Sequence, residues 1–372
     1  MNLTKLENAE AIALIAIIMA NKIILNVPKL IILSTGTSAW INVIFISVLA
    51  VLLACLISSL FKNFPNADIL DVSSYLGKNL LKNIVGIIHL IIILVTVSLT
   101  IRNFSENLKI IYFNNSPIIY IVLFFVILAC FSSRYSLKII SKVTLIVAPL
   151  IFGGLILIAL FISPNYVVER LFPILGYGAK TTFITGATNI FSFSGLSYLF
   201  FLKPFLKNEA DLKKISVISV IISGIYLLIS IICLLLSFSF ILESNENLSI
   251  YLLSRATRYG IFIDNANAIY ILLWILSVFS YISVSLFFII YISRKLTNLK
   301  YTNPINYCFG SIILGLSLIL QNYAQYQTIF SIILKNVILI YVFGINILIL
   351  ILANIKLKIT NKNHTNDISL TD

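Results

Sequence analysis

Two apolar stretches of the sequence are interrupted by residues of the kind that bind small molecules. The interruption in the stretch 185–204 has five members: Phe191, Ser192, Phe193, Ser194 and Gly195. The interruption in the stretch 9–32 has two parts: Ala20, Asn21 and Lys22, followed by Asn26, Val27 and Pro28. A helix that unwinds at such residues exposes backbone N–H and C=O groups, which a membrane tolerates only where protein or a watery cavity covers them. Paired interruptions of this kind point to a transporter-type binding site.

The chemistry of such a site follows from the ends of the broken helices. The N-terminus of a half-helix carries partial positive charge and free N–H groups, which suit a carboxylate. An ammonium group would face carbonyls of the other half-helix. We therefore predict that Asn21, Lys22 and the run 191–195 bind substrate. The alternatives are small-residue helix packing for Ser192 and Ser194, and core or lipid packing for Phe191 and Phe193.

Lys22 is the strongest single candidate for a functional residue, because a cation inside an apolar span is costly and usually functional. It could hold a substrate carboxylate, or it could occupy the place of a coupling cation. The alternative is that its side chain snorkels to the membrane interface. We expect Lys335 to snorkel near an outer span end, and His89 to be structural.

Three serines recur at helical spacing in a later apolar stretch, at Ser277, Ser280 and Ser283. Together with Ala20 they could line an ion site or the pocket. The same stripe also serves tight helix packing. Both readings remain open from the sequence.

The composition identifies an integral membrane protein. Of 372 residues, 60% are hydrophobic and 10% charged, whereas soluble domains carry about 25% charged residues. The net charge of +13 lies in short loops, so membrane topology explains it and nucleic acid does not. The stretch before the first span lacks a signal-peptide layout, so we expect that span to be retained. Four scattered cysteines are expected to be buried small hydrophobes: Cys55, Cys130, Cys233 and Cys308.

Windows of about 20 apolar residues predict an all-α fold with ten transmembrane helices. We place them near 9–32, 40–61, 84–101, 117–132, 141–163, 181–202, 214–240, 266–293, 305–321 and 330–355.

The distribution of Lys and Arg predicts the orientation. With the N-terminus in the cytoplasm, the inside segments hold 17 basic residues and the outside loops hold 6, so both termini are predicted to be cytoplasmic. The inside segment 66–82 resembles a short amphipathic helix in the interface, with Asp68 and Asp71 on its polar side. The longest outside loop is predicted at 240–265.

The two halves of the chain correspond. The interruptions at 21 and 192 are 171 residues apart, and the starts of spans three and eight, and five and ten, differ by 182 and 189. An odd number of spans in each half makes the second half inverted. We predict a five-plus-five inverted repeat (LeuT-like) with helices 1 and 6 discontinuous. The predicted domain is 1–359, with repeats 1–163 and 164–359 and a polar cytoplasmic tail at 360–372.

An ordered set of short motifs resembles the endospore germination permeases, the B-type membrane subunit of nutrient germinant receptors. This family is similar to the amino acid/polyamine/organocation transporter superfamily. The motifs are NVP (26–28), FP (64–65), SYLGK (74–78), RNFSE (102–106), LFPILGYG (171–178), FSFSG (191–195), LKP (202–204) and SRATRYG (254–260).

The resemblance implies a function that composition cannot show. Such subunits lie in the inner membrane of dormant spores and work with an A-type membrane subunit and a C-type lipoprotein. They sense a nutrient, usually an amino acid or a sugar, and trigger germination. Family members often carry glutamine and glycine where this chain has Asn21, Lys22 and Ile23, so the ligand itself is not transferred.

The sequence thus predicts a germinant receptor subunit that binds a small nutrient, an amino acid by expectation, between helices 1 and 6. The alternatives are a working amino-acid permease, cation-coupled or facilitative, and a scaffold whose site has decayed. No phosphate-binding glycine loop, metal-ligand cluster or catalytic constellation is present in the sequence. We therefore expect no enzyme activity, no cofactor and no metal.

Overall fold

The computed structural model describes residues 4–25, 27–238, 249–256, 267–298, 303–319 and 333–368. Asn26, most of the predicted outside loop 240–265 and the end of the predicted tail lie outside the described residues. So do the side chains of Lys335 and of residues 361–368.

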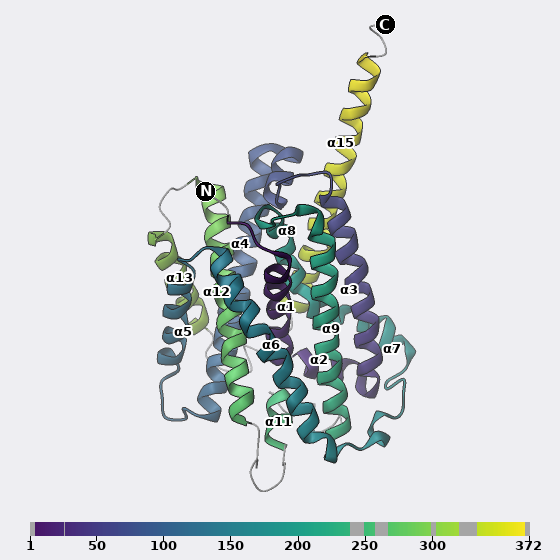
Figure 1. The fold of residues 1–372 in the computed structure, drawn as a ribbon, viewed down its shortest axis with the longest axis vertical. Helices are drawn as coiled ribbons and strands as arrows, with labels where there is room; N and C mark the ends of the chain where they lie inside the picture. The colour runs from purple at the N-terminus through teal and green to yellow at the C-terminus, as the bar shows by residue number, and fades with distance from the viewer. Residues whose placement is uncertain are drawn as a thin grey trace.

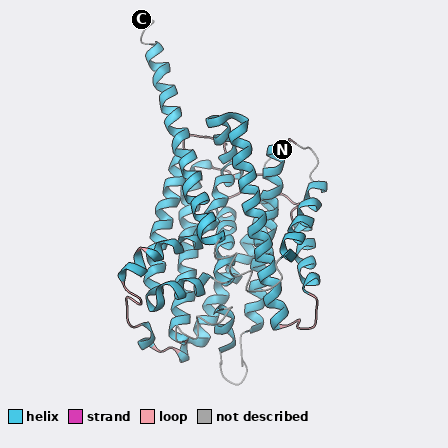
Figure 2. Ribbon diagram, turned by 180° about the vertical axis from the view of Figure 1, so that it is seen from behind, coloured by secondary structure: helices cyan, strands magenta, loops and turns pink. Residues whose placement is uncertain are grey.

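Nearly all of the described chain is helical, and Figure 2 shows helices and connecting loops throughout. The longer elements are α1 (Asn8–Leu25), α2 (Val27–Thr35), α3 (Ala39–Phe61), α4 (Ile69–Ile111), α5 (Ile118–Ser132), α6 (Leu137–Ile162), α7 (Ala179–Phe183), η4 (Thr185–Tyr198), α8 (Leu199–Leu202), α9 (Leu212–Ser237), α11 (Ser249–Ala256), α12 (Asn267–Thr297), α13 (Asn303–Ile319), η7 (Ile333–Ile345) and α15 (Asn346–Ile368).

Six helical stretches of the described chain are long and apolar enough to cross a bilayer, so the chain is an integral membrane protein. They are Val27–Phe61, Ile69–Ile111, Leu137–Asn165, Glu209–Ser237, Asn267–Thr297 and Asn336–Thr360. Two shorter apolar helices, Ile118–Ser132 and Pro304–Ile319, accompany them. Helix is present at each of the ten predicted positions, and the count of ten spans stays a prediction.

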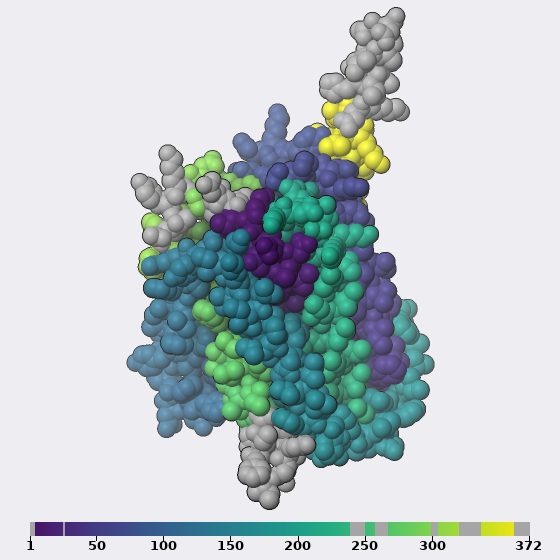
Figure 3. Space-filling model, viewed as in Figure 1, coloured from purple at the N-terminus to yellow at the C-terminus, as the bar shows by residue number. Residues whose placement is uncertain are grey.

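α1 forms the centre of the bundle. It packs against α6, α9, α12 and η4, and every residue from Ala13 to Ile24 is buried. In the view of Figure 3 the start of the chain reaches the surface near the upper end, between α6 and α9. Asn21 and Lys22 are both buried, and exposing such side chains to lipid is costly, which favours the central place of α1.

The described chain ends lie at the same end of the bundle, the upper end in Figure 1, which we call the terminal face. α4 begins there with a short helix, 69–76, that ends where Gly77 and Lys78 have non-helical backbone angles. The amphipathic helix predicted at 66–82 is therefore present but shorter. The prediction that Asp68 lies on a polar side was wrong, because Asp68 is fully buried.

The helix of predicted span three does not end near residue 101, since α4 continues to Ile111. Arg102, predicted to lie in an outside loop, is 6% exposed. It pairs with Glu106 at 3.1 Å, one helical turn away, and Phe104 and Leu108 continue the buried apolar side of the helix. The ion pair offsets both charges, so the helix continues through Arg102 and Glu106.

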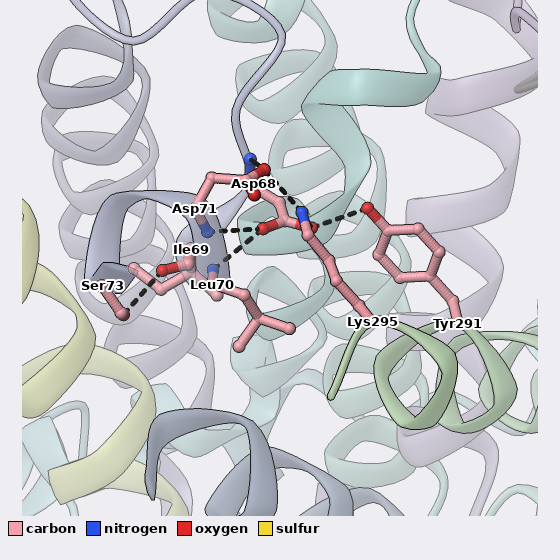
Figure 4. Close-up of polar contacts among 7 residues, drawn as sticks. All are labelled: Asp68, Ile69, Leu70, Asp71, Ser73, Tyr291 and Lys295. Atoms are coloured by element: carbon pink, nitrogen blue, oxygen red, sulfur yellow. Dashed lines mark hydrogen bonds and ion pairs between the residues drawn. The ribbon is translucent and has the colours of Figure 1, made fainter. Parts of the chain in front are cut away.

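Asp68 ties the start of α4 to α12 (Figure 4). One carboxylate oxygen accepts hydrogen bonds from the backbone N–H groups of Leu70 and Asp71, and the other accepts from the Tyr291 hydroxyl at 2.6 Å and Lys295 Nζ at 2.7 Å. Lys295 also contacts Asp71 at 2.5 Å. Burial raises the pKa of Asp68, and the Lys295 ammonium opposes that rise. The carboxylate thus depends on Lys295 for its charge.

A second set of contacts holds the chain start against the segment after α8. Leu6 exchanges backbone hydrogen bonds with Phe205 and Lys207, at 2.7 and 3.0 Å. Lys203 Nζ donates to the carbonyls of Phe61 and Phe64, both at 2.6 Å. These contacts fix the outer ends of α1 and α8 at the terminal face, and so position the middle parts of the two stretches.

Lys295→Met should destabilise the protein by about 3 kcal/mol, because it leaves the buried Asp68 carboxylate without its cation. Lys358→Met, at an exposed position of α15, serves as the control and should change stability by less than about 0.5 kcal/mol. The measurement is reversible unfolding in detergent. Equal stability of the two variants would contradict the assigned role of Asp68.

Candidate ligand-binding site

The first apolar stretch is divided near its middle. α1 ends at Leu25 and α2 begins at Val27, with Pro28 in the first turn of α2. Proline lacks the N–H group that a continuous helix needs, and it is well tolerated at a helix start. The sequence Asn-Val-Pro thus accounts for a new helix at this point.

The second interrupted stretch departs from α-helix over its whole middle. Residues 185–198 form a 3-10 helix of 14 residues, with Phe193 outside helical geometry at φ −93° and ψ 16°. Such helices seldom exceed three or four residues, and long ones mark strain or a functional hinge. The segment is rich in Gly, Ser and Thr, which favour helix weakly. The Ser192 hydroxyl donates to the Asn189 carbonyl at 2.7 Å, a bond that competes with regular helix.

Ala20, Asn21 and Lys22 are helical and lie in α1, so the first stretch divides further on than these three residues, between α1 and α2. The last turn of α1 contacts the second interrupted stretch inside the bundle. Lys22 Nζ donates to Ser194 Oγ at 2.6 Å, and the two side chains are 7% and 1% exposed. Gly195 lies directly on α1, since a Cβ there would be 2.8 Å from Met19 Cγ and 3.2 Å from Ile18 Cγ2. The side chain of Lys22 therefore points into the bundle and not toward a membrane interface.

Asn21, the residue before Lys22 on α1, is fully buried. Neither its Nδ2 nor its Oδ1 has a hydrogen-bond partner within the described chain. Burying a polar group without a hydrogen-bond partner costs about 1–3 kcal/mol. Such groups are uncommon in folded proteins. Asn21 is therefore the residue of the site whose hydrogen-bonding capacity remains open.

The other predicted residues of the two interruptions have packing roles here. Phe191 and Phe193 are 2% and 1% exposed, and the tip of Phe193 lies 3.8 Å from a Cβ built on Gly224 of α9. Ala20 is fully buried on α1. These residues thus belong to the packed interior of the bundle.

The serines of α12 are not brought to this contact by any described hydrogen bond. Ser280 donates to the Leu276 carbonyl, and Ser283 donates to Phe279 and accepts from Ser132 of α5. Ser280 and Ser283 line a groove of about 280 Å³ between α5, α6 and α12. Ser277 is fully buried and its hydroxyl has no partner among the described residues. The predicted ion site at these serines stays a prediction.

Three polar residues that the sequence did not single out hold η4 in place at the end opposite the terminal face. Asn189 donates to Ser34 of α2 and to Asn42 of α3, both at 2.9 Å. Asn42 donates to the Thr182 carbonyl at 2.7 Å. The sequence signal that could have identified these contacts is a single asparagine within each of two apolar stretches.

Further toward the terminal face, polar side chains join α4 and α12 to their neighbours. The Tyr198 hydroxyl lies 2.7 Å from Ser285 Oγ. His89, expected to be structural, is 2% exposed and contacts the Tyr341 hydroxyl at 2.8 Å and Asn346 Nδ2 at 3.4 Å. These contacts connect helices and match a structural role for His89.

Comparison with known proteins relates the chain to one family and one fold. The profile of the family described as "Spore germination protein" matches residues 5–326. Crystal structures of two mutants of a manganese transporter from Eremococcus coleocola are similar, at TM-scores of 0.52 and 0.50 and identities of 14% and 13%. In both, 93% of this chain and 77% of that chain are covered. No curated protein matches the chain. At this identity the structural likeness concerns the fold alone.

Gly195→Ala should destabilise the protein by about 1–3 kcal/mol, because the added methyl group enters the space of Met19. Gly153→Ala is the matched control, since a Cβ at Gly153 meets nothing within 4 Å, and it should be neutral or slightly stabilising. Denaturant unfolding in detergent measures both. Adding Met19→Ala to Gly195→Ala should restore part of the loss. If the two glycine variants are equally stable, η4 does not pack on α1 as described.

Proposed function

We propose a function from one premise: the chain belongs to the spore germination protein family. The chain is the nutrient-binding membrane subunit of a spore germinant receptor. Its ligand, an amino acid by expectation, binds between α1 and η4 and signals germination together with partner subunits. One observation supports this location of the binding site: Lys22 of α1 and Ser194 of η4 form a buried hydrogen bond.

The full architecture belongs to the same proposal. Ten spans form a five-plus-five inverted repeat in which spans one and six are the interrupted ones. Helix at all ten predicted positions and the likeness to a transporter fold support it. The terminal face is then the cytoplasmic side, with both chain ends there, and the membrane is the inner membrane of the spore. An A-type membrane subunit and a C-type lipoprotein are the proposed partners.

Signalling requires that the ligand bind two conformations with different affinity. In this structure Lys22 and Ser194 are closed off from both ends of the bundle. Contacts of Asp68 and Lys203 close the terminal face, and contacts of Asn42 and Asn189 close the opposite end. Rocking of one helix group against another would break one set and keep the other. Ligand occupancy would bias that choice and pass it to the partners.

A working amino-acid permease is the alternative, because it would share the same fold and the same broken helices. Family membership favours the receptor. The manganese transport named for the structural relatives is not carried over. Within the described ranges no three His, Cys, Asp or Glu side chains gather in a way that could hold a metal ion.

Deleting the gene in the sporulating host separates the two functions. The receptor predicts that spores lose germination with one or a few nutrients, while vegetative uptake of the same nutrients is unchanged. Both are measured against a panel of amino acids and sugars. Complementation with Gly195→Leu should fail and with Gly153→Leu should succeed, at equal protein levels. Normal germination with lost uptake of one solute would instead establish a permease.

A further inference from the structure

We propose that Lys22 meets the ligand as an ammonium and that the ligand is therefore a small carboxylate with net negative charge, whose amino group is dispensable. This inference rests on the proposed function for the location of the site. It goes further by naming the charge and chemical group that the site selects, which family membership does not.

The charge of Lys22 has no counter-charge in the described chain. Its described hydrogen bond goes to a neutral hydroxyl, that of Ser194. The ion pairs of the described residues involve Arg102, Lys203 and Lys295, and none involves Lys22. The acid on the same helix, Glu10, is bonded to the backbone N–H of Glu7 and lies 12 residues away, about 18 Å along the axis.

A buried ammonium without a counter-charge is expensive in an apolar medium. A ligand that brings one negative charge removes that cost, and a ligand of zero net charge leaves it in place. A zwitterionic amino acid would also need an acceptor for its own ammonium, and no carboxylate of the described chain is available beside Lys22. The charge balance thus favours a monoanion over a zwitterion.

The hydrogen-bonding groups at the site are mostly donors. An ammonium has three N–H groups, and Ser194 takes one of those of Lys22. Ser194 accepts that bond, so its own O–H remains free to donate. Asn21 Nδ2 adds two more N–H groups without described partners. These five donors, three of them at the Lys22–Ser194 contact, match the lone pairs of a carboxylate, which accepts about four hydrogen bonds.

The remaining acceptor, Asn21 Oδ1, sets a limit on what else the ligand carries. It can receive one hydrogen bond from a neutral hydroxyl or from an amino group. It does not supply the negative charge that an ammonium would require. Phe191 and Phe193, which are buried close to Ser194 in the sequence of η4, favour a short aliphatic chain beyond the carboxylate.

Binding to purified protein in nanodiscs tests the inference with matched probes. Each probe set contains an amino acid, its des-amino acid and the corresponding carboxamide, for example alanine, propionate and propionamide, across side chains of increasing size. Titration calorimetry should find the best des-amino acid binding at least as tightly as its parent amino acid. Its carboxamide should bind about 100-fold more weakly, the range for a lost charged hydrogen bond.

Variants of Lys22 give the second measurement. Lys22→Met keeps the length of the side chain and removes the charge, so carboxylate affinity should fall by about 100-fold. It should leave carboxamide affinity unchanged, a result that loss of folding would not produce. Lys22→Arg should retain carboxylate selectivity, and Lys358→Met should match the unmodified protein.

Equal affinity for an acid and its amide would overturn the inference, as would a Lys22→Met variant that binds acids normally. Binding of sugars, with no carboxylate of the panel bound, would overturn it as well. In each of these cases, loss of nutrient germination in the deletion strain would leave the proposed function standing. Normal germination in that strain would remove both proposals together.

Discussion

The interior of this protein depends on one constraint: polar groups buried in an apolar medium must find partners within the chain. The hydrogen bond from Lys22 to Ser194 gives both side chains a partner where α1 contacts η4. Asn189 and Asn42 meet it on one side of the site, and Asp68 with Lys295 meets it at the terminal face. Each interhelical position is thus set by a small number of polar contacts within extensive apolar packing. Asn21 is among the buried residues whose polar atoms have no partner in the described chain, and the proposed ligand would be its partner.

Much of the fold could be predicted from the sequence because the signals were long. Apolar runs of about 20 residues locate helices whatever their partners are, and helix is found at every predicted position. The departure from α-helix at Phe193 was foreseen from Ser and Gly in an apolar stretch. The buried direction of Lys22 was one of two alternatives, because a lysine side chain can reach either a cavity or an interface. Only the packing of α1 decides between them.

What could not be predicted came from pairings between distant segments. The charge of Arg102 by itself favours a loop, whereas Glu106 offsets that charge one helical turn later. Asp68 was assigned to a solvated side, since neither Tyr291 nor Lys295 is near it in sequence. Asn42 and Asn189 each look like isolated polar residues until α3 and η4 meet. The serines of α12 share a helical stripe, and yet their hydrogen bonds lead to α5 and to α12 itself.

The central place of α1 has a consequence for biosynthesis. Residues 13–24 have no side that faces lipid, and their neighbours α6, α9 and α12 are made after them, the last more than 240 residues later. α1 is made before these neighbours and therefore enters the membrane with an ammonium and an amide that they do not yet cover. It must be held by the insertion machinery, or remain loosely inserted, until α12 is complete. Assembly of this protein thus depends on α12, and truncation before α12 would leave α1 without one of its main packing partners.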